Sequence, residues 1–416
     1  MVKRPSHHQC PVDLSNGPAV SDPYPAYRLL RETAPVCSTS EGGWIVSRYH
    51  DVVDLLHDPR CAHWGQDPGV EHALTATEAA LARCLHALSP TYPLPFRQAV
   101  LQHLSARALD RYAAGICQHA NMLLCHLRGT SSFDVMADYA HPFTFGSVCR
   151  VIGVPEEDIT TVSDIVGKLG SPYLACIGTD HKGRYAAFTG YLYDLIADRR
   201  GRAGDDLISC LTAIANRGHH YELGGKCHFD TAELVNLIVL LLYAGHVNMM
   251  NFIGNAIRVL GQRPEVCAAL RRAPEKMGDA FLELLRFDSP VQFILLVARE
   301  TFALHDQTIN SGDRIRACVG SANRDPVVHV NPDLLDLTRR PRQQVAFGAG
   351  PLRCIGARLA QLEGTTALAS FLHHVAEFTL PQEPLRWRTG TGAQRGLYAL
   401  PVEQVTYAAI ETSKPF

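Results

Sequence analysis

The sequence predicts a mainly α-helical protein with a smaller β region. Apolar residues recur every three or four positions through most of the 416-residue chain, and the longest such face runs over 231–260. Short runs rich in β-branched residues, separated by turn residues, are concentrated over 290–319 and again before residue 405. Helix therefore outweighs strand, and the strands are expected to cluster after Pro290.

Helices in the first half of the chain are predicted where an apolar face follows a turn. Asp22 and Pro23 precede a short helix, and a compact strand over 44–47 precedes the next one. The stretch 66–95 is poorly patterned, with helical pieces. Gly153 and Gly218 end two later helices. The predicted helices cover 25–33, 51–56, 96–106, 109–127, 143–152 and 205–216.

The second half begins with a long helix, for which Thr231 is the expected N-cap. It has about 30 residues and a length of about 45 Å at 1.5 Å per residue. Helices over 264–272 and 274–287 follow, and then the strands, an irregular stretch over 323–345 and a final helix over 354–372. Length alone would suggest two or three domains, but no repeat, low-complexity tract or linker interrupts the pattern.

Composition places the chain among ordinary globular proteins. It is 46% hydrophobic and 19% charged, and its formal net charge of −2 does not favour nucleic acid or an anionic membrane as partner. The polar stretch 1–13 does not resemble a signal peptide, and the longest apolar run, 237–245, is too short to span a bilayer. A soluble cytoplasmic protein is expected.

Thirteen cysteines are present, without any C-x-x-C pair, and most are expected to be small buried hydrophobes. His219, His220, Cys227 and His228 lie close together, but their spacing fits no common zinc finger. A solvated loop is the favoured interpretation of that segment.

One cysteine stands in a distinctive setting. Phe347, Gly348, Gly350, Cys354 and Gly356 form the pattern F-G-x-G-x-x-x-C-x-G. Glycines allow backbone to pass close to a large flat object, and the pattern presents a single thiolate at the start of a helix. The alternative is a buried thiol like the others.

Three further motifs occur in a fixed order. Ala244-Gly245-His246 lies in the long helix, and Ala322-Asn323-Arg324-Asp325-Pro326 lies in the irregular stretch. Between them Glu283 and Arg286, three apart, share one face of a helix. The alternatives are a tolerated helix glycine and a solvated surface ion pair.

The order and spacing of these four motifs resemble the cytochromes P450. Because the resemblance covers essentially the whole chain, it implies that residues 1–416 form a single P450-like domain. It implies the P450 fold, a triangular prism of helices with a long central helix and a cysteine loop before the last long helix. It also implies haem b, with Cys354 as thiolate ligand to the iron, which favours O–O bond cleavage. In the family, the Glu283–Arg286 pair joins an arginine, expected here to be Arg324, and braces the cysteine loop.

The long helix departs from the family pattern. After the alanine–glycine pair the family usually has an acid and then a threonine, which help to deliver protons to iron-bound dioxygen; here Val247 and Asn248 stand in those places. Valine has no proton to relay, and an asparagine amide does not ionise near neutrality. Ala244, Gly245, Val247 and Asn248 are expected to line the distal pocket. His246 is a candidate replacement base, and Met249, Met250 and residues 293–296 are candidates for substrate wall or core.

The expected cations around the haem propionates are also depleted. Of about four basic residues that are usual in the family, Arg97 remains, and Leu296 and Leu352 occupy two of the other places. Arg299 and Arg353 are candidate substitutes at neighbouring positions. Because an unpaired buried carboxylate is costly, the propionates need solvent or other donors, or haem binds weakly.

These features predict a haem-thiolate oxidoreductase of natural-product biosynthesis. The expected reaction is oxidative coupling, cyclisation or substrate-assisted oxidation, on a moderately hydrophobic small molecule. Ferredoxin and ferredoxin reductase would supply electrons, and residues 66–88, 171–184 and 293–296 would form the substrate walls. Two alternatives remain open: a P450-fold enzyme that works without haem redox chemistry, such as a cyclase, and a non-catalytic helper of a partner enzyme.

Overall fold

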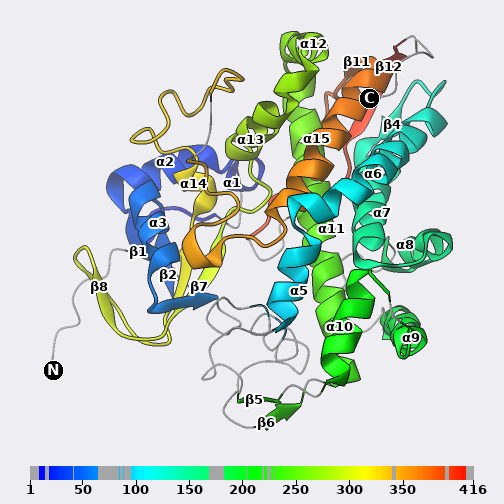
Figure 1. Ribbon diagram of the computed structural model, residues 1–416. Coiled ribbons are helices and arrows are strands. Elements are labelled where there is room, and N and C mark those ends of the chain that lie inside the picture. Colours follow the sequence, from blue (N-terminus) through cyan, green and yellow to red (C-terminus); the bar gives the residue numbers. More distant parts are fainter. Residues whose placement is uncertain are drawn as a thin grey trace. The chain divides into compact units, whose positions relative to one another are not determined.

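The computed structural model describes residues 9–14, 18–40, 42–63, 84, 88, 95–167, 182–202, 204–217, 220–222, 226–228, 230–339, 343–388 and 393–408. The chain divides into two compact units, each built from separate segments. Figure 1 labels the helices and strands of the chain. Unit 1 comprises Met1–Asp67, Asn251–Cys354 and Glu377–Val405. Unit 2 comprises Pro68–Met250, Ile355–Ala376 and Thr406–Phe416.

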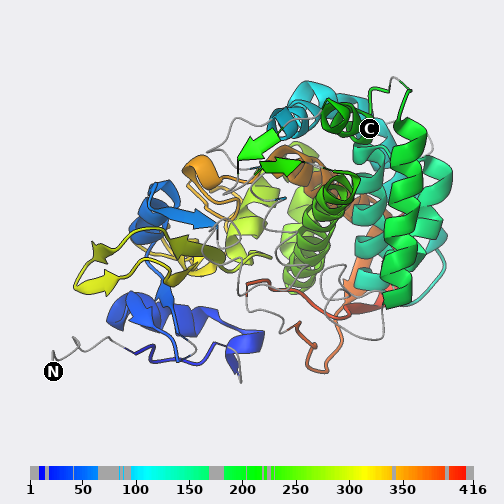
Figure 2. The same ribbon diagram turned by 90° about the horizontal axis from the view of Figure 1, so that it is seen from below.

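Unit 1 contains a five-stranded sheet in the order β1 (Val36–Ser38), β2 (Trp44–Val46), β10 (Arg314–Ala317), β7 (Ile294–Ala298) and β3 (Cys61–His63). N-terminal strands (blue) and strands that follow Pro290 (yellow) lie together in it (Figure 2). β10 runs parallel to β2, with Ile315 opposite Trp44, and antiparallel to β7, with Ile315 opposite Leu296. These three side chains are at most 4% exposed and belong to one hydrophobic cluster, which holds the sheet together.

The elements of unit 1 alternate between short helices and short strands. They are α1 (Pro18–Ser21), α2 (Tyr24–Thr33), β1 (Val36–Ser38), β2 (Trp44–Val46), α3 (Tyr49–His57), β3 (Cys61–His63), α12 (Pro264–Arg272), α13 (Met277–Phe287), β7 (Ile294–Ala298), β8 (Phe302–Leu304), β9 (Gln307–Ile309), β10 (Arg314–Ala317) and α14 (Val319–Ala322). Strand β11 (Val375–Thr379) begins at the end of unit 2, and β12 (Pro401–Tyr407) ends in it.

Unit 2 is helical over most of its described length. Its elements include α5 (Pro95–His103), α6 (Ala106–His126), β4 (Phe133–Asp134), a π-helix (Val135–Ala140), α7 (His141–Ile152), α8 (Ile159–Gly167), α9 (Lys182–Arg199), α10 (Leu207–Asn216), β5 (His220–Glu222), β6 (Lys226–His228) and α15 (Ala357–His374).

The core of unit 2 lies where α6, α7 and α15 pack together. The Tyr139 hydroxyl donates to the carbonyl oxygen of Ala367 in α15 at 2.8 Å. Its ring stacks on Phe143 of α7, with centroids 5.9 Å apart, and lies near Phe371 of α15. Because the hydroxyl has a partner, this tyrosine can be fully buried without leaving an unpaired donor.

The longest helix, α11 (Thr231–Gly261), begins in unit 2 and ends in unit 1. An Asp230 carboxylate oxygen accepts the Glu233 N–H at 2.9 Å, so the N-cap is Asp230 and the prediction of Thr231 was wrong by one residue. By length and composition α11 could cross a bilayer, although 72% of its most apolar stretch is buried inside the protein. That burial is typical of a core helix.

The predicted mainly helical fold is confirmed, and the predicted helices of both halves agree with the structure to within a few residues. The expectation that strands cluster after Pro290 was wrong in part, because β1 and β3 join β2 in the main sheet. The segment interpreted as a solvated loop contains the β5–β6 hairpin. Most of 66–95 and 171–181 lies outside the described residues.

Candidate functional site

The cysteine loop of unit 1 turns back on itself immediately before α15. A single 3₁₀ turn (Gly350–Leu352) precedes Cys354, and the final helix begins at Ala357 rather than at the cysteine as predicted. The Cys354 N–H donates to the Phe347 carbonyl oxygen at 2.8 Å, which closes the loop. Cys354 itself is exposed, and so is Arg353. The loop therefore presents its thiol outward.

Two glycines make this turn sterically feasible. Gly348 and Gly350 have φ angles of 72° and 55°, in the left-handed region that side chains disfavour. A Cβ on Gly350 would lie 2.4 Å from the His57 ring, and one on Gly348 would lie 2.9 Å from the Leu352 carbonyl oxygen. Gly356 serves as the N-cap residue of α15. Gly348 and Gly350 thus have a structural cause within unit 1 itself.

Behind the loop, Glu283 and Arg286 form a fully buried ion pair on α13. Arg286 binds the carboxylate with two nitrogens, Nε and Nη2, each at 2.8 Å. Both side chains are 0% exposed, so the alternative of a solvated surface pair is excluded. Arg286 also donates to the carbonyl oxygens of Asn323 (2.9 Å), Pro332 (2.9 Å) and Leu334 (3.2 Å). All three carbonyl acceptors lie in the irregular stretch 323–345, which the ion pair therefore anchors.

Asn323 connects this ion pair to the cysteine loop. Its backbone carbonyl accepts from Arg286, and its side-chain Oδ1 accepts the Val345 N–H at 2.8 Å. The Val345 carbonyl in turn accepts the Gly348 N–H at 2.9 Å. A continuous chain of hydrogen bonds therefore runs from α13 to the first glycine of the loop.

The third member of the cluster is Arg339, not Arg324 as expected. Arg339 Nε lies 3.4 Å from Glu283 Oε1, and the guanidinium also donates to the Val330 carbonyl oxygen at 2.9 Å. Arg324 instead pairs with Asp333 at 2.9 Å and donates to a carbonyl at the end of α13. Both arginines stabilise the irregular stretch, but through different partners.

The segment of α11 that holds Ala244, Gly245, Val247 and Asn248 belongs to unit 2. Ala244 is exposed and Val247 is 6% exposed. The Asn248 amide donates to the Ala244 carbonyl oxygen at 3.5 Å, a long hydrogen bond. A Cβ on Gly245 would lie 2.7 Å from Val148 of α7, so close helix packing is a further reason for this glycine.

His246 is fully engaged by α7. Its Nδ1 lies 2.8 Å from the Thr144 hydroxyl, and its Nε2 lies 3.1 Å from His141 Nδ1. Because the Thr144 hydroxyl donates to the Ala140 carbonyl oxygen, it accepts from His246 Nδ1–H, and His246 Nε2 accepts from His141. Both ring nitrogens are thus committed, which argues against His246 as a replacement base.

The candidate cation positions differ in their surroundings. Arg97 Nη1 donates to the Leu88 carbonyl oxygen at 2.7 Å, and burial lowers the pKa of its guanidinium. Leu296 is 1% exposed in the core of the main sheet, whereas Leu352 is half-buried. Arg299 is half-buried and Arg353 is exposed. Met249, Met250 and Phe293 are at most 6% exposed, as core residues are.

A mainly helical fold that presents one exposed cysteine before its last long helix, with a buried Glu–Arg pair behind it, is typical of haem-thiolate proteins. The family model described as Cytochrome P450 matches residues 171–386. The chain belongs to the cytochrome P450 family and is therefore a cytochrome P450 oxidoreductase.

Relatives at about 30% identity cover nearly the whole chain. The vitamin D(3) 25-hydroxylase of Pseudonocardia autotrophica is 31% identical over 396 residues, which cover 94% of this chain and 96% of that protein. The polyketide biosynthesis cytochrome P450 PksS of Bacillus subtilis is 30% identical over 380 residues, with coverages of 86% and 88%.

Solved structures of cytochromes P450 also resemble this chain. The cytochrome P450 enzyme CxnD, for C–S bond formation in chuangxinmycin biosynthesis, matches with a TM-score of 0.78 at 25% identity. The match covers 96% of this chain and 98% of that one.

Proposed function

We propose that this protein is a haem-thiolate oxidoreductase of natural-product biosynthesis in which Cys354 binds the iron. The observation that carries the proposal is the loop geometry: an exposed thiol, held by the Cys354–Phe347 hydrogen bond, between two left-handed glycines and the start of α15. PksS and CxnD, by their names, serve polyketide and chuangxinmycin biosynthesis. They support a natural product or its precursor as substrate.

The residues of the loop fit haem. A cysteine thiolate is one of the protein ligands that haem iron takes, and the exposed Cys354 in its glycine-turned loop would supply it. In the part of the chain that the structure describes, no group of three or more His, Cys, Asp or Glu side chains could hold a separate metal ion. When bound, haem would supply the oxidative chemistry, and Cys354 would tune it through its thiolate.

The protein's own residues would then hold and orient the reactants. Phe347, Gly348, Gly350 and Gly356 would shape the loop around Cys354, braced by Glu283, Arg286 and Arg339. Arg97 and Arg353 would face the propionates. Arg353 is exposed, and Arg97 would have to exchange its hydrogen bond to Leu88 for a propionate. This arrangement supports propionates that are partly solvated.

Val247 and Asn248 support a reaction that does not depend on an acid–alcohol relay. Val247 is buried and has no exchangeable proton, and the Asn248 amide donates to its own helix. Oxidative coupling, cyclisation and substrate-assisted oxidation are reactions that do not require this relay. We infer a small-molecule substrate, electron delivery by a ferredoxin and its reductase, and a cytoplasmic location.

The purified protein is expected to contain haem and to show a Soret band. Its ferrous–CO complex should absorb at the position that thiolate ligation gives. The measurement is a CO difference spectrum together with the iron content of protein expressed with a haem precursor. A colourless protein without iron would contradict the proposal and favour a P450-fold enzyme or helper that works without haem redox chemistry.

Restoring the relay is expected to change the chemistry. In the double variant Val247→Asp with Asn248→Thr, burial raises the pKa of the new carboxyl, so that it can carry a proton near neutrality. Hydroxylated product per NADPH should rise about tenfold or more, since proton transfer by a positioned group contributes at least about a hundredfold elsewhere. Product analysis and NADPH coupling provide the measurement.

Met249→Leu, a volume-conserving change on the same helix, is the matched control and should leave both readouts unchanged. Identical products and coupling in the double variant and the wild type would show that the relay is irrelevant here.

A further inference from the structure

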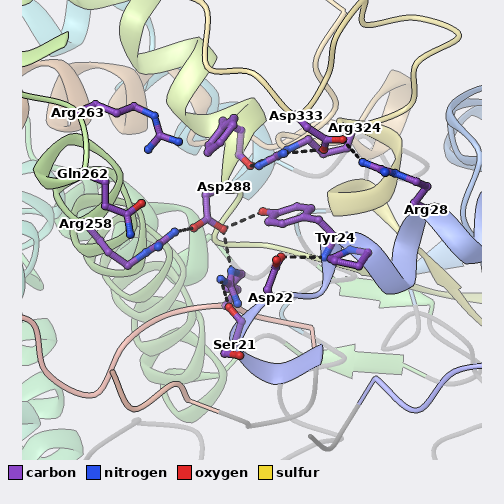
Figure 3. A pocket seen from close by; sticks show the side chains of 13 residues that line it. Ser21, Asp22, Tyr24, Arg28, Arg258, Gln262, Arg263, Asp288, Arg324 and Asp333 are labelled. Atoms are coloured by element: carbon purple, nitrogen blue, oxygen red, sulfur yellow. Dashed lines mark hydrogen bonds and ion pairs between the residues drawn. The ribbon is translucent and has the colours of Figure 1, made fainter. Parts of the chain in front are cut away.

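We propose that a pocket in unit 1, which does not include Cys354, binds a phosphate monoester. The cavity has a volume of about 340 Å³ and is lined by residues from α2, the end of α11, the end of α13 and the irregular stretch (Figure 3). It does not depend on the proposed haem chemistry. Its recognition chemistry comes from arginine side chains.

Positive charge exceeds negative charge in this pocket. Five arginines and three aspartates line it, so the arginines exceed the aspartates by two. A phosphate monoester carries close to two negative charges at neutral pH and offers three strong acceptor oxygens. The arginines are Arg28, Arg258, Arg263, Arg324 and Arg395, and the aspartates are Asp22, Asp288 and Asp333.

The Asp288 carboxylate is already paired with side chains of the protein. It is 2% exposed and accepts from Arg258 Nη2, Arg395 Nε and the Tyr24 hydroxyl, each at 2.8 Å. Burial alone would raise the pKa of Asp288, but the charges of Arg395 and Arg258 outweigh burial and hold it below its usual value. Asp288 is therefore ionised and shared between two cations.

The remaining aspartates are also engaged. Asp333 is shared by Arg28 and Arg324, again one carboxylate for two guanidinium groups. Asp22 accepts the Tyr24 N–H at 3.3 Å at the start of α2. The protein's own acids thus leave part of the guanidinium charge unbalanced.

That imbalance is greatest beside Arg263. In the part of the chain that the structure describes, no carboxylate forms an ion pair with Arg263. Its Nη1 donates to the Val259 carbonyl oxygen at 2.9 Å, and its guanidinium lies over the Phe287 ring. Burial lowers its pKa, and the charge of Arg258 lowers it further; Glu265 opposes this effect, and Arg324 adds a smaller lowering effect. An anion here would relieve this repulsion.

Unused donors lie next to Arg263. Arg258 Nε is buried and has no hydrogen-bond acceptor among the described residues, and Gln262 offers an amide. Figure 3 shows Arg258, Gln262 and Arg263 grouped on one side of Asp288. Guanidinium groups bind phosphate oxygens in a planar, two-pronged manner. The anion is therefore assigned to the space between these three side chains.

The end of α11 opposes an anion, because a helix C-terminus carries partial negative charge. Arg263 offsets this effect, since it donates to a carbonyl of the last turn. The two excess cations would contribute less binding free energy to a singly charged phosphate diester than to a dianion. The pocket is thus expected to prefer the monoester.

The test uses methyl phosphate and dimethyl phosphate as probes, with isothermal titration calorimetry at constant ionic strength. Wild-type protein should bind methyl phosphate with a dissociation constant of about 1 mM or tighter, and dimethyl phosphate more weakly. Arg263→Gln should weaken methyl phosphate binding about tenfold, because it removes a charged donor. Arg272→Gln, an exposed position in the last turn of α12, is the matched control and should bind as the wild type does.

Equal binding by Arg263→Gln and the wild type, no binding by the wild type, or equal affinity for both phosphates would overturn the proposal. An unchanged thermal midpoint will show that Arg263→Gln is folded. A Cys354→Ser variant should still bind methyl phosphate, so failure of the haem proposal and failure of this one remain distinguishable.

Discussion

Cys354→Ser is expected to abolish turnover and to remove the thiolate-type band from the ferrous–CO spectrum. A serine hydroxyl does not provide the thiolate that donates electron density to haem iron. The loop should keep its shape, because the hydrogen bond from the Cys354 N–H to the Phe347 carbonyl oxygen uses backbone atoms and the two left-handed glycines are retained. The measurements are product formation, falling to the background of the assay, and the CO difference spectrum.

Cys125→Ser is the matched control. Cys125 is also exposed, but it lies on α6, away from the loop in sequence, and its removal should leave spectrum and turnover unchanged. A Cys354→Ser protein that keeps both the band and the turnover would refute the assignment of Cys354.

Arg286→Met is expected to lower the free energy of unfolding by about 3–5 kcal/mol, because removing one partner of a buried ion pair leaves the other charge uncompensated. Here the loss would reduce the ion pairing of the Glu283 carboxylate to the longer 3.4 Å contact with Arg339 and deprive the carbonyl oxygens of Asn323, Pro332 and Leu334 of their donor. Urea unfolding, followed by circular dichroism, measures the change. Arg286→Lys should recover part of it, since lysine keeps the charge but not the planar fork.

Arg202→Met provides the comparison at an exposed pair. Arg202 and Asp198 are 71% and 43% exposed and lie four residues apart on the surface. Their loss should cost less than about 0.5 kcal/mol. If Arg286→Met cost no more than Arg202→Met, the buried pair would not be the support inferred here.

Local signals in the sequence predicted most helices, whereas the sheet required contacts that no local pattern carries. Pro264 at the first turn and paired arginines at the last define α12, and the predicted range matches it. Strand β3 has only three residues, and its partner β7 lies more than 200 residues later in the chain. Such short strands gain their stability from pairing and burial rather than from intrinsic preference.

In the candidate site, too, local motifs mark some residues, whereas only the fold reveals the others. The cysteine loop and the Glu283–Arg286 pair were predictable, because both have fixed local spacing. Arg339 lies 56 residues after Glu283, and no motif marks it. Likewise His141 lies 105 residues before His246, so only the fold reveals that the histidine is already engaged.

The hydrogen-bond chain from Arg286 through Asn323 and Val345 to Gly348 has a thermodynamic consequence. Ordering the backbone of a ten-residue loop costs on the order of 10 kcal/mol in conformational entropy. Here that entropy is lost when unit 1 folds, because these hydrogen bonds and the two left-handed glycines already hold the loop in one conformation. A ligand that binds at Cys354 therefore meets a preorganised surface, and its binding free energy goes into affinity rather than into ordering the loop.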